Sequence, residues 1–104
     1  MAWILLFVAG LLEVVWASTM KLSDGFTRPL PAAITIVALI ASFALLAAAM
    51  RELPLGTAYT IWTGIGAIGA FVVGIVFLGE AITPARLLAA VLIVSGIGLM
   101  KLSS

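Results

Sequence analysis

This sequence contains no cysteine and no histidine, and only 9% of its 104 residues are charged. The absence of cysteine excludes disulfides and thiolate nucleophiles, and the absence of histidine removes the commonest general base and metal ligand. No nucleophile and base pair can be recognised either. We therefore predict no enzymatic activity, no cofactor and no metal site. The net charge is +1 without a basic cluster, so we also expect no nucleic-acid partner.

Hydrophobic residues, in contrast, make up 65% of the chain. Soluble domains carry about a quarter charged residues, and a soluble core of this size could not bury so much apolar surface. A membrane hydrocarbon layer about 30 Å thick requires about 20 apolar residues in a helix. The segments 2–20, 32–50 and 55–78 have about that length, so we predict that each of them spans the membrane.

A fourth apolar run lies between Arg86 and Lys101 and is short for a span. These two side chains can extend their charges to the membrane surfaces, so we predict a fourth helix over 85–102. The predicted fold is an all-α integral membrane protein with four transmembrane helices in a single domain, residues 1–104. The first run carries Glu13 and lacks an obvious cleavage site, so we expect it to be retained rather than removed as a signal peptide.

The positive charges are almost evenly divided between the two predicted membrane faces. Lys21, Arg28 and Arg86 fall on one face, and Arg51 and Lys101 fall on the other. An excess of Lys and Arg on one side normally fixes the orientation of a membrane protein. The near balance therefore predicts insertion in both orientations, and such dual topology permits an antiparallel homodimer.

Glu13 is the only acidic residue inside a predicted span. Along a helix it lies about 18 Å from the first residue and about 12 Å from Lys21, so its side chain cannot easily reach a membrane surface. A charged carboxylate at this depth costs roughly 2.5 to 3.5 kcal/mol, so it requires a proton, a cation or a water-lined cavity. A carboxyl group that holds either a proton or an organic cation can exchange the two. The alternative is that Glu13 only fixes the packing of the helices.

Several residues share the helical face of Glu13, and their types predict that this face lines a cavity. Gly10 lies one turn before it and Trp16 one turn after it, which combines open space with an indole donor. In the second helix, a small stripe is predicted to face protein: Thr35, Ala38, Ser42 and Ala49. Ser42 either orients Glu13, accepts a hydrogen bond from a bound cation, or bonds back to its own helix.

The third helix presents Tyr59, Trp62, Thr63 and Gly66 on one face. The buried indole N–H of Trp62 requires an acceptor such as a carboxylate. The rings of Tyr59 and Trp62 can also hold a cation. The alternative for Tyr59 is that it only anchors the helix at the membrane surface. Trp3 is predicted to be such an anchor. Gly64 and Gly66 favour either a hinge or a close helix contact.

The fourth helix carries two small residues, Ala89 and Gly96, one heptad apart on an otherwise bulky surface. Small residues at this spacing allow two helices to approach closely in a membrane. We therefore predict that Ala89 and Gly96 lie in a helix-helix contact of a dimer.

Taken together, these segments resemble the small multidrug resistance family over essentially the whole chain. The resemblance rests on GLLEVVWA around Glu13, KLSDGFTR in the first loop, LPLGTAYTIWTGIGA in the third helix, GEAITPAR in the last turn and SGIGLMK in the fourth helix. Trp16, together with the K-x-S-x-G-F-T-R loop, looks like the guanidinium-exporter branch. The quaternary-ammonium branch usually carries a glycine-threonine pair at the Trp16 position.

The resemblance implies an antiparallel homodimer, surrounded by lipid in the bacterial inner membrane, that exports guanidinium or a small substituted guanidinium cation in exchange for protons. It implies that Glu13 of both subunits binds substrate and proton. The family's other functional positions match the following residues: Gly10, Trp16, Ser42, Tyr59, Trp62 and Lys101. Ala89 departs from the glycine often found at its position. A multidrug antiporter for quaternary ammonium cations, a small channel and a structural membrane subunit remain as alternatives.

Overall fold

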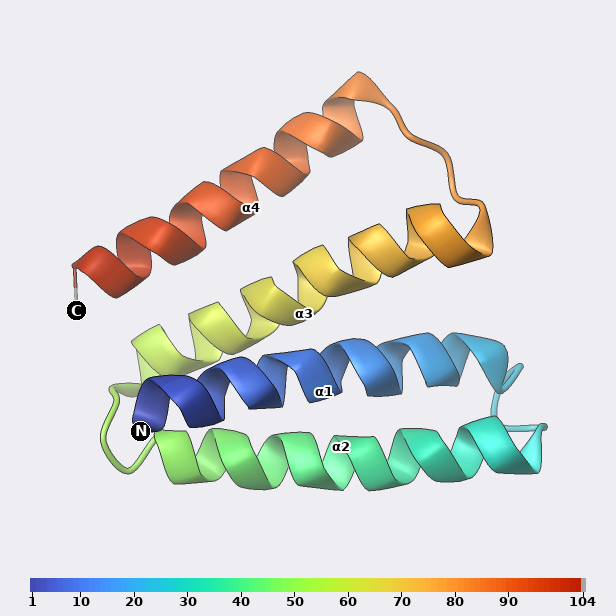
Figure 1. Cartoon of the computed structure of the whole chain (residues 1–104), viewed down its shortest axis with the longest axis horizontal. Coiled ribbons are helices and arrows are strands. Elements are labelled where there is room, and N and C mark those ends of the chain that lie inside the picture. Colours follow the sequence, from blue (N-terminus) through green and yellow to red (C-terminus); the bar gives the residue numbers. More distant parts are fainter. Residues whose placement is uncertain (104) are drawn as a thin grey trace.

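The computed structural model describes residues 1–103 as four helices joined by short turns (Figure 1). In chain order the helices are α1, Ala2–Leu22; α2, Pro29–Ala49; α3, Leu55–Leu78; and α4, Pro84–Leu102. All four are long and apolar enough to cross a membrane. The prediction of an all-α chain with four apolar helices is confirmed.

Helix boundaries follow from the proline residues of the loops. The second helix begins at Pro29 rather than at residue 32, because proline lacks only an N–H that has no partner in the first turn anyway. The fourth helix begins at Pro84, and the side chain of Thr83 caps it by accepting a hydrogen bond of 3.1 Å from the backbone N–H of Arg86. Pro29 and Pro84, which lie outside the predicted spans 32–50 and 85–102, are therefore the first residues of α2 and α4.

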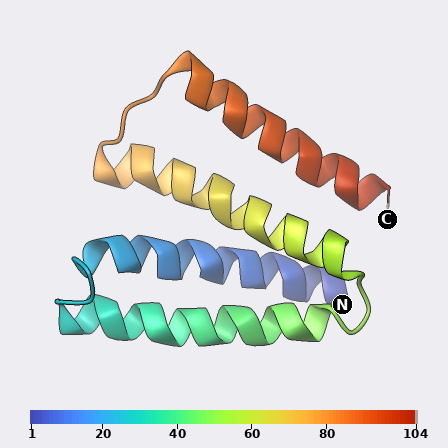
Figure 2. The same ribbon diagram turned by 180° about the vertical axis from the view of Figure 1, so that it is seen from behind.

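Successive helices run in opposite directions, and α1 packs against both α2 and α3 (Figures 1 and 2). α2 scarcely touches α3, so α1 holds the first three helices together. α4 packs mainly against α3, with Lys101 near its end lying over the Trp3 ring of α1, and none of its described residues is buried. The chain is thus a three-helix unit with a fourth helix attached along one side.

The face of α2 that packs on α1 is the predicted stripe of small residues. Thr35, Ala38, Ser42 and Ala49 are buried, whereas Ile36 and other bulky residues of the helix are exposed. The prediction that this stripe faces protein is therefore confirmed. Small side chains let the two helices approach closely, as is typical of membrane helix pairs.

Glycines produce an equally close contact between α1 and α3. A methyl group at Gly10 would come within 2.6 Å of Ile65, and one at Gly69 would overlap Val14. The predicted open space at Gly10 is therefore filled by Ile65, because the missing side chain lets α3 approach.

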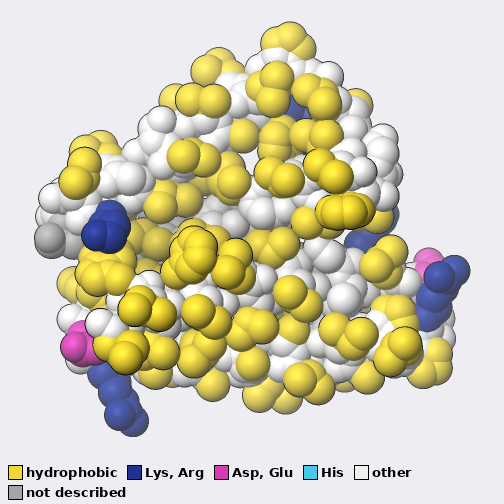
Figure 3. Space-filling model, viewed as in Figure 1, with side chains coloured by type: hydrophobic (Ala, Val, Ile, Leu, Met, Phe, Trp, Pro, Cys, Tyr) yellow, Lys and Arg dark blue, Asp and Glu magenta, His cyan; other side chains and the backbone are white. Residues whose placement is uncertain are grey.

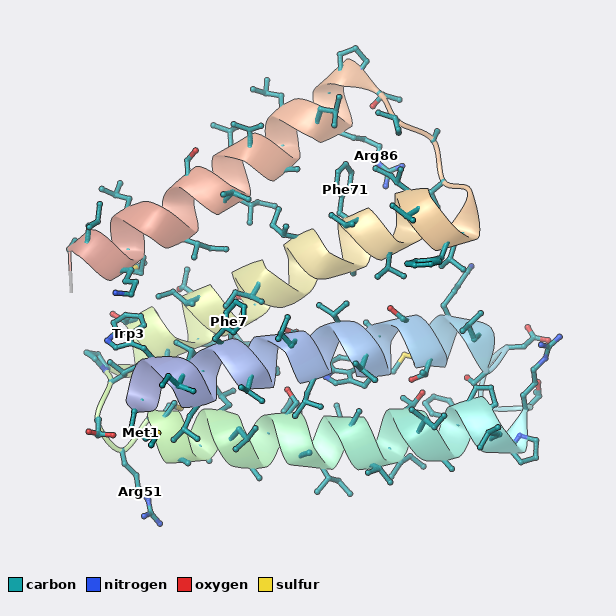
Figure 4. All side chains as sticks on the ribbon, in the orientation of Figure 1. Met1, Trp3, Phe7, Arg51, Phe71 and Arg86 are labelled. Atoms are coloured by element: carbon teal, nitrogen blue, oxygen red, sulfur yellow. The ribbon has the colours of Figure 1, made fainter. Side chains whose placement is uncertain are left out.

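The turn between α3 and α4 is held by Arg86, which Figure 4 shows near Phe71. The guanidinium carbon lies 5.1 Å from the centre of the Phe71 ring, and Nη2 lies 3.4 Å from Oε1 of Glu80. Gly79 ends α3 in the left-handed conformation that favours glycine, with φ of 69°. These contacts set where α4 begins.

The surface is dominated by hydrophobic side chains, with the charged side chains gathered at the two ends of the helices (Figure 3). Bulky residues of α4 such as Leu88, Leu92 and Leu99 are exposed. An apolar surface of this extent suits contact with lipid or with other membrane helices.

Substitution of Gly69 by alanine is expected to destabilise the chain by about 1 to 3 kcal/mol, because the added methyl group overlaps Val14. Thermal unfolding in detergent, followed by circular dichroism, measures the effect. Gly56→Ala is the matched control, since nothing lies within 4 Å of a methyl group built there. Equal melting temperatures for the two variants would contradict the close contact.

Candidate functional site

Glu13 lies in the middle of α1, half-buried against α3. A methyl group at Gly66 would occupy the position of the Glu13 carboxylate, so only glycine at this point of α3 leaves room for it. The sequence placed Gly66 on the face of Tyr59 and Trp62, and the structure packs Gly66 of this face against the carboxylate.

Two polar atoms in this region are buried without a hydrogen-bond partner among residues 1–103. They are Oε1 of Glu13 and Nε1 of Trp16, which project from α1 one turn apart. An unpaired buried polar group costs about 1 to 3 kcal/mol, and folded proteins pair nearly all such groups. Glu13 and Trp16 therefore carry the buried polar side-chain atoms of residues 1–103 whose hydrogen-bonding capacity the chain leaves unused.

Ser42 does not bond back to its own helix, so that alternative is wrong, and its contact with a bound cation stays a prediction. Its hydroxyl donates to the backbone oxygen of Ala9 at 2.7 Å and accepts from Nε1 of Trp62 at 3.0 Å. Trp62 therefore donates to a hydroxyl rather than to the Glu13 carboxylate that we expected. One side chain of α2 thus joins α1 to α3, one helical turn before Glu13.

The indole of Trp62 also anchors a small group of aromatic rings. Its centre lies 5.6 Å from that of Tyr59 and 5.4 Å from that of Phe43, both in tilted arrangements. Tyr59 remains 52% exposed, whereas Trp62 is buried. Phe43 was not among the predicted site residues, although it directly follows Ser42 and its ring contacts Trp62.

Thr63 does not join this group. Its hydroxyl bonds back to the oxygens of Tyr59 at 2.9 Å and of Thr60 at 3.1 Å. Its side chain lines a groove between α3 and α4 that also contains Gly96. Helical spacing placed Thr63 on the same face of α3 as Trp62. In the structure, α4 packs beside this part of α3, and Thr63 lies in the groove between the two helices.

The glycines predicted to form a hinge lie within a continuous helix. α3 runs unbroken through Gly64 and Gly66, which pack against Ile97 and Glu13 respectively. Both contacts agree with the close-packing alternative, and bending at these residues stays a prediction. Ala89 and Gly96 line grooves between α4 and α3, and Gly96 has open space around it.

No group of three or more acidic, histidine or cysteine residues in the described part of the chain could hold a metal ion. Within residues 1–103 the one ion pair joins Arg86 to Glu80, far along the chain from Glu13. The buried polar atoms without a partner in this part of the chain are a carboxylate oxygen and an indole N–H, those of Glu13 and Trp16.

Comparison with known proteins gives a consistent result. Residues 1–93 match the family described as Small Multidrug Resistance protein. A guanidinium exporter of Citrobacter freundii is 60% identical over 104 residues, which cover 100% of this chain and 99% of the relative. Guanidinium exporters of Salmonella typhimurium strain LT2 and Escherichia coli strain K12 are 59% and 58% identical over the same shares of both chains.

Replacing Ser42 by alanine is expected to lower the free energy of unfolding by about 1 to 3 kcal/mol, because the Trp62 indole N–H then stays buried without an acceptor. In a Trp62→Phe background the same replacement should cost less, since that N–H is already gone. A double-mutant cycle of thermal stabilities measures the coupling between the two side chains. Additive effects of the two substitutions would contradict the hydrogen bond.

Proposed function

The chain belongs to the small multidrug resistance family, and from this premise we propose that it is an antiporter that exports guanidinium in exchange for protons. The chain has four apolar helices and resides, as a multi-pass protein, in the bacterial inner membrane. Its relatives at 58% to 60% identity are named guanidinium exporters, not enzymes. The observation that carries the proposal is the unpaired oxygen of Glu13 at membrane depth.

Guanidinium suits this carboxylate for geometric reasons. The cation is planar and weakly hydrated, and its paired N–H donors match the two oxygens of a carboxylate. Oε1 of Glu13 is buried without a donor in the chain, so a bound guanidinium supplies what is missing. Trp16 can donate its free N–H to a carboxylate oxygen and so fix the plane of the group.

The aromatic rings provide the second part of the proposed site. Trp62 is held in place by its hydrogen bond to Ser42, and Tyr59 and Phe43 lie against it. Aromatic faces attract cations, and the attraction is stronger where water is excluded. In the proposed site Ser42 therefore acts on the substrate through Trp62, as a positioning residue.

Proton coupling follows from competition for one group. A carboxylate in hydrocarbon must be neutralised, and either a proton or a guanidinium ion can do so. Once a proton or a guanidinium ion has neutralised the carboxylate, the other cation is no longer attracted to it. Release of protons on one side of the membrane and of guanidinium on the opposite side then gives export driven by the proton gradient.

The proposal includes an antiparallel homodimer, because two copies bring two Glu13 residues to one site. The near balance of positive charge supports insertion in both orientations. The apolar surface of α4, with Ala89 and Gly96 on it, supports a helix contact between copies. Two facing carboxylates repel each other, so the pair exchanges protons as a unit. Movement at Gly64 and Gly66 would change the side to which the pair opens.

Glu13→Gln is expected to abolish guanidinium currents in proteoliposomes, because the amide can neither release a proton nor pair with a cation. Solid-supported-membrane electrophysiology at several pH values measures exchange. The matched control is Glu52→Gln, since Glu52 is exposed in the loop before α3. Export of guanidinium by the Glu13 variant, driven by a pH gradient, would show that the proposed mechanism is wrong.

Trp16→Phe is expected to weaken guanidinium binding about tenfold, because an aromatic ring remains but the N–H donor to the carboxylate is lost. Trp3→Phe is the control, since that indole lies at the start of α1. Trp16→Gly should admit larger cations such as benzyltrimethylammonium. If the unchanged protein already transports that ion as well as guanidinium, it is a multidrug antiporter instead.

A further inference from the structure

An apolar cavity of about 190 Å³ lies at the end of the molecule where α1 and α3 begin and α4 ends. Figure 4 shows Trp3 and Phe7 on the first turns of α1 at this end, beside the beginning of α3. Aliphatic and aromatic side chains line most of the cavity, and one cation lies among them: Trp3, Leu6, Phe7, Ile61, Ile97 and Lys101. Neither Glu13 nor Trp16 borders it, so this cavity lies apart from the carboxylate of the proposed transport site.

Lys101 is placed at this cavity by an aromatic contact. Its Nζ lies 4.9 Å from the centre of the Trp3 ring, a distance at which a cation is attracted to the ring face. Within residues 1–103 the one ion pair joins Arg86 to Glu80, so in this part of the chain Lys101 has no carboxylate partner. Its positive charge lies beside an apolar space.

We propose that this cavity binds an anionic phospholipid, with the phosphate at Lys101 and part of one acyl chain in the apolar space. Apolar cavities of about 150 Å³ stay dry and accept apolar ligands, so the lining favours hydrocarbon over water. Tryptophan is typical of the membrane surface, and lysine there attracts anionic lipid. The proposal does not depend on the transport function.

The chemistry of the cavity selects among possible occupants. A free anion gains nothing from the apolar wall, and a zwitterionic lipid brings its own ammonium group toward Lys101. A second copy of the chain has a different surface available, because Leu88, Leu92 and Leu99 leave α4 exposed away from this cavity. An amphiphile with net negative charge fits both the wall and the cation.

Native mass spectrometry of the full chain, purified in detergent and mixed with phosphatidylglycerol or phosphatidylcholine, tests the proposal. The unchanged protein should retain phosphatidylglycerol preferentially. Lys101→Gln should lower this retention about fivefold, the usual effect of one cation near an anionic membrane surface. Arg51→Gln is the matched control and should retain the lipid fully, because Arg51 is an exposed cation at the same end that does not line the cavity.

A second variant tests the apolar part of the site. Gly98 lines the cavity, and nothing lies within 4 Å of a methyl group built on it, so Gly98→Leu should fill the space and also reduce retention. Equal losses in Lys101→Gln and Arg51→Gln would overturn the proposal in favour of general surface charge. Displacement of the lipid by inorganic phosphate would do the same in favour of a simple anion site. A photoreactive residue in place of Gly98 should capture phospholipid, and capture of a second copy would identify the wrong occupant.

Discussion

Close approach of α1 and α3 is the constraint on which the rest of the molecule depends. Gly10 and Gly69 let the two helices meet through Ile65 and Val14, and between these contacts the Glu13 carboxylate occupies the space left by Gly66. A larger residue at any of these glycines would separate the helices or displace the carboxylate. The same contact that packs the bundle therefore also buries Oε1 of Glu13 where no donor of the described chain reaches it.

Some polar side chains within the helices have hydrogen-bond partners in the chain, and others have none. Ser42 uses its hydroxyl twice, toward Ala9 and toward Trp62, and Thr35 pairs with Thr19 at 2.6 Å. These bonds tie helices together and use the one O–H donor of Ser42 within the chain. Glu13 and Trp16 are not satisfied in this way, and this contrast, more than depth alone, distinguishes the proposed site from structural polar contacts.

Hydrophobic runs, charged loop residues and glycines were sufficient to predict the number of helices, their approximate positions and the buried face of α2. Those features depend on local sequence, because span length and small-residue stripes are read along one helix. The partner of Trp62 could not be predicted in that way. Both Ser42 and Glu13 are acceptors of suitable chemistry, and only the relative shift of α1, α2 and α3 decides that the hydroxyl is nearer. Phe43 was missed for the same reason.

The fourth helix shows the limit of what one chain can explain. α4 buries none of its described residues and packs mainly against α3, yet its sequence is as apolar as that of a membrane span. Lipid can cover such a surface at no cost in hydrophobic free energy, so exposure alone does not require a protein partner. Ala89 and Gly96 differ from the leucines of this surface, because they line the grooves where α4 meets α3. In the proposed dimer, the same small side chains would let a helix of a second copy approach α4.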